Sequence, residues 1–152
     1  MSISYEPTEA ERLDAVWHKL VWTLQRQSTQ LWKGQLKDLS TIEVSILEII
    51  EQNPEVVLKE ILARLGVPNS TLTNAVNRLE GRGLIRRAIH SRDKRSFTLQ
   101  LTEAGLAAQE EHKCYEQLLW QRIFGAFDSA EQRAQLIDLL SKLADSLDTP
   151  AE

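Results

Sequence analysis

The chain lacks the features that mark secreted, membrane and disulfide-stabilised proteins. Its one cysteine, Cys114, cannot form a disulfide within the chain, which fits a reducing compartment. No apolar run approaches the roughly 20 residues that a bilayer-spanning helix needs. Residues 1–7 have neither the basic nor the apolar region of a signal peptide. We therefore expect a cytoplasmic protein that does not associate with membranes.

The sequence also lacks the constellations that support catalysis or metal binding. Its three histidines, His18, His90 and His112, are scattered along the chain. His112 and Cys114 lie two residues apart on a predicted helix, so they face different sides and cannot converge on a metal or form a nucleophile and base. No phosphate-binding glycine loop or paired-carboxylate motif occurs. We expect no enzyme, no metal and no cofactor.

Two short helices joined by a tight turn are predicted between residues 58 and 82. Apolar residues recur at helical spacing over 58–65 and again over 72–79. Gly66 stands where the first helix needs a C-cap, because glycine adopts the left-handed conformation without strain. Two helices joined this closely must cross steeply, which is typical of a helix-turn-helix.

The hydrophobic period changes after Gly83. Residues 84–85 and the alternating apolar residues of 97–101 predict two strands, and the polar segment 90–95 predicts the loop between them. A helix-turn-helix followed by such a hairpin is a winged helix.

The charge of the chain is strongly polarised. Residues 64–95 carry eight basic and two acidic side chains, a net charge of +6, whereas the whole chain carries −4, so the remainder sums to −10. The basic part can neutralise phosphates, and the acidic remainder would orient the approach to DNA. A charge run alone usually marks a solvated surface. Here it coincides with the two elements that a winged helix presents to DNA.

Long amphipathic helices flank the winged helix, at about 8–34 and 103–148. Their apolar stripes exceed what a small winged helix needs to cover its core. The simplest way to bury these stripes is against the same pair of helices in a second copy of the chain, which predicts a two-fold homodimer. The alternative is that they complete the core of a monomer.

The winged-helix region is expected to span residues 40–102. A capping box formed by Ser40 and Glu43 opens its first helix, and Asn53 with Pro54 ends it. The predicted fold class is mostly α (α+β): one unit over 1–152, with a winged helix-turn-helix between N- and C-terminal helices that form a dimerisation region.

The most specific motif lies in the wing. Residues 83–87 (GLIRR) are followed by 93–95 (DKR) and then by 99–105 (LQLTEAG). With these motifs, nearly the whole chain resembles the MarR family of bacterial winged-helix transcriptional regulators. The resemblance implies a dimer with interleaved terminal helices and regulation by small, often aromatic or phenolic ligands, or in some branches by cysteine oxidation. The reactive cysteine of those branches lies near the N-terminus, so we expect Cys114 to be inert.

The second helix of the motif opens near Pro68 and is expected in the major groove. Asn74 is the favoured base reader, because an amide can pair bidentately with adenine. Arg78, one turn further, can reach a guanine or the backbone. The family commonly has Ser or Thr where this chain has Pro68, which offers no capping oxygen. The predicted DNA contacts of this helix are Asn69, Ser70, Thr71, Thr73, Asn74 and Arg78.

In the wing, the resemblance places Arg95 in the minor groove and gives Asp93 the role of holding the hairpin in shape. Arg92 and Lys94 are then expected to meet phosphates. The remaining basic residues of the hairpin, Arg86 and Arg87, are neighbours on a strand and face opposite sides. At most one of these two is expected to contact DNA well, and the other to form an ion pair or lie on the surface.

The tryptophans of the first helix allow two readings. Such residues usually fill a core or a dimer interface, and this is the preferred reading of Trp17. The family's ligand cleft, however, lies beside this helix. Trp17, His18, Trp22 and Arg26 are therefore also candidates to line it, with the arginine and histidine suited to a carboxylate or phenolate.

Together these patterns predict a dimeric, sequence-specific DNA-binding transcriptional regulator, in particular a ligand-responsive repressor with a palindromic operator. The competing class is a winged-helix module that docks an acidic protein partner on its basic face. Binding to duplex DNA at low salt would separate the two.

Overall fold

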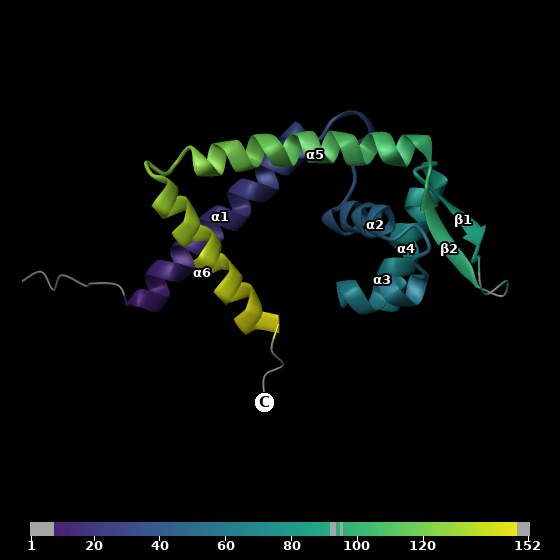
Figure 1. The fold of residues 1–152 in the computed structure, drawn as a ribbon, viewed down its shortest axis with the longest axis horizontal. Helices are drawn as coiled ribbons and strands as arrows, with labels where there is room; N and C mark the ends of the chain where they lie inside the picture. The colour runs from purple at the N-terminus through teal and green to yellow at the C-terminus, as the bar shows by residue number, and fades with distance from the viewer. Residues whose placement is uncertain (1–7, 92–93, 95, 149–152) are drawn as a thin grey trace, which may run out of the picture. The chain divides into compact units, whose positions relative to one another are not determined.

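The structure is a computed structural model that describes residues 8–91, 94 and 96–148, without the side chains of 28–31. It divides into two compact units, residues 1–112 and 113–152, and each is described by itself. The predicted single unit over 1–152 stays a prediction. The elements (Figure 1) are α1 (Glu9–Leu31), the 3-10 helix η1 (Gly34–Leu36), α2 (Thr41–Gln52), α3 (Leu58–Leu65), α4 (Asn69–Gly81), β1 (Ile85–Ile89), β2 (Phe97–Leu101), α5 (Glu103–Phe124) and α6 (Ala130–Asp148).

The hydrophobic core of the first unit lies between α2, α3, α4 and the β1–β2 sheet, which Figure 1 shows packed together. Ile46, Ile61, Leu72 and Leu84 are each fully buried there, one from each of α2, α3, α4 and the turn before β1. Burying such side chains contributes about 1.5–3 kcal/mol each. The predicted winged helix is therefore confirmed, and its core is made by the residues at helical spacing.

The predicted helix ends are confirmed in detail. The Ser40 N–H donates to Glu43 Oε2 at 2.7 Å, and the Glu43 N–H donates to Ser40 Oγ at 3.3 Å, which completes the capping box of α2. Gly66 ends α3 with φ 61°. Pro68 is the N-cap of α4 and, as expected, provides no side-chain cap.

The wing is an antiparallel hairpin whose inner half belongs to the core. Ile85 pairs with Leu101 and is buried, whereas at the outer end Ile89 pairs with Phe97 and these side chains are 65% and 61% exposed. The Leu99 N–H also donates to the Val56 carbonyl at 3.1 Å, which ties the hairpin to the segment before α3. The base of the hairpin is thus anchored in the core, whereas Ile89 and Phe97 further out are exposed.

The start of α5 explains the threonine and glycine of the LQLTEAG motif. The Thr102 hydroxyl donates to the Gly83 carbonyl at 2.6 Å and accepts the N–H of Gly105 at 3.1 Å. Gly105 is buried, and a Cβ built on it would collide with the Leu84 carbonyl oxygen. The motif therefore joins the turn between α4 and β1 to the first turn of α5.

The second unit contains the remainder of α5 and all of α6. No side chain of α6 is buried in the described chain. Most of its large apolar residues are instead exposed, with Leu140 at 53% and Leu143 at 43%. Over the residues that the structure describes, no helix combines the length and apolarity required to span a membrane.

Candidate nucleic-acid interface

Helix α4 divides into a buried and a polar face, as its sequence period predicted. Leu72, Ala75, Val76 and Leu79 are buried against α2 and β1. The predicted base-contacting residues lie on the other sides of the helix. Asn69, Ser70, Thr73, Asn74 and Arg78 are exposed, while Thr71 is half-buried.

Thr71 and Asn74 line one side of a hollow of about 230 Å³ between α4 and the start of α2. Ile42 and Glu43 line the other side. Of the two α4 residues in this lining, Thr71 is half-buried and Asn74 is exposed. Ser70 and Thr73 do not line this hollow.

Arg78 has a partner that sequence reasoning did not foresee. Its Nε lies 3.2 Å from Oε1 of Glu43, whose side chain is only 1% exposed, whereas the Arg78 side chain is 61% exposed. Its Nη2 also donates to the Asp38 carbonyl at 3.4 Å. The guanidinium is thus oriented by α2 and by the preceding loop while most of the side chain stays open to solvent.

The first wing strand is joined to α4 by Arg87. Its Nε donates to Glu80 Oε2 and its Nη2 to Asn77 Oδ1, both at 3.2 Å. This agrees with the expectation that one of the two strand arginines forms an ion pair. Sequence reasoning missed Asn77, although its position three residues after Asn74 places it on the same exposed side of the helix.

Several other arginines of the basic cluster, residues 64–95, also have partners within the chain. Arg64 Nη2 donates to Gln52 Oε1 at 2.7 Å, and Arg86 Nη2 donates to Gln100 Oε1 at 3.1 Å. Arg82 donates to two backbone carbonyls of the loop after α1. The basic cluster therefore holds the winged helix together as well as carrying its positive charge.

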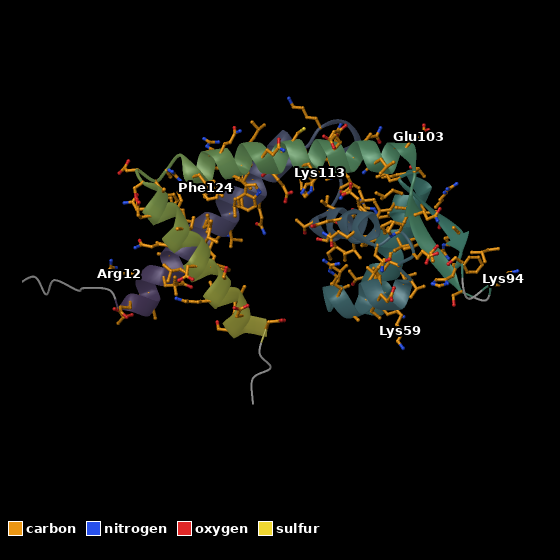
Figure 2. All side chains as sticks on the ribbon, in the orientation of Figure 1. Arg12, Lys59, Lys94, Glu103, Lys113 and Phe124 are labelled. Carbon is orange, nitrogen blue, oxygen red and sulfur yellow. The ribbon has the colours of Figure 1, made fainter. Side chains whose placement is uncertain are left out.

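Lys94 is exposed, and Figure 2 shows it at the outer end of the hairpin. The other predicted wing contacts, Arg92, Asp93 and Arg95, lie outside the described residues. Their roles stay predictions.

The four predicted ligand residues lie on α1. The rings of His18 and Trp22 are 5.5 Å apart, and Trp17 and Trp22 are 49% and 65% exposed. Trp17 is thus about half exposed and is not among the buried core residues of the described chain. Arg26 is also exposed.

A cavity of about 700 Å³ lies at the other end of α1. None of the four predicted ligand residues is in its lining. The residues that line it are Gln25, Trp32, Lys33, Gly34, Lys37, Asp38, Leu39, Ser40 and Thr41.

The described residues contain no group of three or more His, Cys, Asp or Glu side chains placed to hold a metal ion. Cys114 is free and exposed on α5. The polar face of α4 beside the basic wing is thus the site that the fold presents.

Comparison with known proteins identifies the family to which this winged helix belongs. The family model described as "MarR family" matches residues 39–97, the winged helix itself. The chain is 31% identical over 145 residues to the uncharacterized HTH-type transcriptional regulator YwhA of Bacillus subtilis, covering 93% of this chain and 99% of that protein. The chain belongs to the MarR family. It is a DNA-binding transcriptional regulator of the MarR type, not an enzyme.

Solved structures of the family have the same fold. The Streptococcus pneumoniae FabT structure in complex with DNA has a TM-score of 0.81 and 24% identity, covering 92% of this chain and 98% of FabT. The Streptomyces coelicolor PcaV regulator, in complex with its natural ligand, has a TM-score of 0.65 and 22% identity, covering 95% of this chain and all of PcaV. The MarR fold therefore extends over nearly the whole chain.

Proposed function

We propose that this MarR-type regulator is a homodimeric repressor that binds a palindromic operator and releases it when a small aromatic acid binds. The observation that carries the proposal is the polar face of α4 beside a basic wing, in a chain whose terminal helices leave their apolar side chains uncovered. Proposed base or phosphate contacts are Asn69, Ser70, Thr71, Thr73, Asn74 and Arg78 of α4, and Arg92, Asp93, Lys94 and Arg95 of the wing.

Exposed apolar side chains on two helices support the dimer. On α1, Leu13 and Val16 are 67% and 64% exposed, and on α6, Leu139 and Leu147 are 64% and 74% exposed. Soluble monomers rarely expose contiguous apolar surface of this kind, so a second copy is the economical cover. Two-fold symmetry then predicts two equivalent half-sites about one helical turn apart, hence a palindrome.

Two features of α1 and the following loop support a ligand. Trp17, His18, Trp22 and Arg26 remain the proposed contacts for an aromatic acid on α1 itself. The cavity of about 700 Å³ at the end of the helix is a separate place, because none of these four residues lines it, and it has the size of a small-molecule site. The solved PcaV complex is an instance of this fold with a bound natural ligand.

Selection of bound duplexes from a random pool, followed by gel shifts, tests the DNA-binding part. We expect an imperfect palindrome, and log affinity that falls with log salt with a slope on the order of −5 or steeper, because several phosphates are neutralised in each half-site. Light scattering should give a mass of two chains. A monomer in solution, or a selected site without two-fold symmetry, would contradict the proposal.

The ligand is tested by titrating the intrinsic tryptophan fluorescence with a panel of benzoic and hydroxybenzoic acids beside the gel shift. An effector should both change the fluorescence and release DNA while the dimer persists, since a small change in half-site spacing costs contacts. If no acid of the panel does both, the proposed ligand class is wrong.

A further inference from the structure

Gln35 lies in the 3-10 helix η1, within the segment 33–38 between α1 and α2 that is called the loop below, and it is held by two helices that are far from it in sequence. Its backbone N–H donates to Glu111 Oε2 of α5 at 3.0 Å. Its carbonyl accepts a hydrogen bond from Nη2 of Arg82, at the C-terminal end of α4, at 2.9 Å. The two helices are thus joined through the backbone of a single residue.

Neighbouring residues of the loop repeat this arrangement. The Leu36 N–H lies 3.4 Å from the same Glu111 oxygen, and Nη1 of Arg82 donates to the Lys37 carbonyl at 2.9 Å. Each of these bonds has one ionised partner, and such bonds are stronger than neutral ones. The carboxylate therefore holds the N–H groups of the loop, and the guanidinium holds its carbonyls.

Gly34 allows the carboxylate to approach this closely. It has φ +53°, in the left-handed region, and a Cβ added there would lie 2.5 Å from Glu111 Oε1. A side chain at this position would thus strain the backbone and displace Glu111. Glycine is the residue that permits the contact.

The same loop forms a wall of the 700 Å³ cavity. Lys33, Gly34, Lys37 and Asp38 all line it. An occupant of the cavity would therefore touch residues on either side of Gln35. Two lysines in the wall favour a small organic anion.

We propose that loop residues 33–38 are the coupling element through which an occupant of this cavity acts on the DNA-reading helix. An occupant that binds better when the loop is displaced shifts the equilibrium toward the displaced loop. This weakens the hydrogen bonds from Arg82 to the Gln35 and Lys37 carbonyls, so the C-terminal end of α4 becomes less stable. Glu111 and Arg82 are positioning residues in this device, because they act through the loop. The inference rests on the proposed ligand-responsive function and adds the route of the response.

Four variants of the full-length chain test the coupling without DNA or ligand. Glu111→Gln removes the charge that holds the loop, and Arg82→Lys keeps its charge but loses the two-pronged grip on the carbonyls. The third variant combines both changes. Glu110→Gln is the matched control, since Glu110 is the exposed neighbour on the same helix.

We expect Glu111→Gln to speed hydrogen exchange at Gln35 and Leu36 and also at residues 82–84, by a factor on the order of five, the effect of losing one hydrogen bond. Glu110→Gln should change neither segment. In thermal melts the double variant should lose less than the sum of the single losses, because both act on one loop. Additive losses, or faster exchange confined to the loop, would overturn the proposal.

Gly34→Ala disrupts the contact between Glu111 and the loop by a change in the loop itself. It is a second, independent variant in case Glu111→Gln fails for a reason unrelated to this contact. It should reproduce the exchange pattern of Glu111→Gln, and an unchanged end of α4 would again overturn the coupling. Affinity for the selected duplex is measured separately. If the wild-type chain selects no duplex, the proposed function fails, while the exchange result still decides whether the loop couples the two helices.

Discussion

The ion pair between Arg78 and Glu43 predicts that one exposed arginine matters more to stability than its surface position suggests. Glu43 Oε1 is buried and accepts no hydrogen bond from the described residues, so replacement of Arg78 by alanine removes the charge that lies 3.2 Å from it. The other oxygen, Oε2, keeps its bonds to the Ser40 N–H and hydroxyl, at 2.7 and 2.8 Å. The variant therefore leaves one of the two Glu43 carboxylate oxygens without the positive charge beside it.

The magnitude follows from the unequal burial of the two partners. Breaking a fully buried ion pair costs about 3–5 kcal/mol, whereas an exposed pair contributes about 0–1 kcal/mol. Glu43 is 1% exposed but Arg78 is 61% exposed, so solvent screens one side of the pair. We expect a loss of about 2 kcal/mol, which corresponds to a fall in Tm of about 4–8 °C for a chain of this length.

Urea and thermal unfolding at one fixed protein concentration measure this loss, since a dimer would make stability depend on concentration. Arg86→Ala is the matched control, because the Arg86 guanidinium bonds an uncharged partner, Gln100, on the exposed part of the wing. It should cost no more than about 0.5 kcal/mol. In a Glu43→Gln background, Arg78→Ala should cost much less than in the wild type, because the buried charge is gone. Equal losses for Arg78→Ala and Arg86→Ala would refute the reasoning.

Three further outcomes are expected. Gly105→Ala should destabilise the chain by about 3 kcal/mol through its collision with the Leu84 carbonyl, while Gly81→Ala, which meets no atom within 4 Å, should not destabilise it; chemical unfolding compares them. Asn74→Ala should lower affinity for the selected operator by about 1–3 kcal/mol and relax specificity at one base pair, seen by repeating the selection. The pKa of Glu131 is lowered by a hydrogen bond from its own backbone N–H and then by one from the Ser129 hydroxyl. Its carboxylate therefore stabilises the start of α6 above the ordinary pKa of 4.5, and this stabilisation is lost as the pH falls through the lower pKa of the folded state. Circular dichroism against pH should therefore show a smaller acid loss in Glu131→Gln, and an identical profile would contradict this.

Local chemistry made much of the fold predictable. The capping box at Ser40, the left-handed Gly66 and the buried face at Leu72 and Leu79 each depend on residues within about two helix turns of one another. The hairpin was equally visible, because alternation and a polar loop mark strands over a short range. The wing motif that carried the family resemblance depends on such short-range order too.

The partners of the basic side chains could not be predicted in this way. From the sequence, Arg78 is a candidate DNA contact and Arg82 is one of the eight basic residues of 64–95. In the structure, Arg78 lies against Glu43, and Arg82 donates to the carbonyls of Gln35 and Lys37. These contacts join residues 35 to 47 positions apart, and a guanidinium accepts any carboxylate or carbonyl that the fold brings within reach.

The sequence by itself thus determined the helices, the hairpin and the polar face of α4, because short-range periodicity and capping specify them. Only the tertiary structure decided which charges hold the molecule together, and it brought Glu111 to the loop at Gln35. The physical reason is that a helix or strand buries apolar residues at a regular spacing, and this spacing can be read directly from the sequence. A hydrogen bond between distant residues forms only after packing has brought their backbones together, so the sequence pattern does not show it.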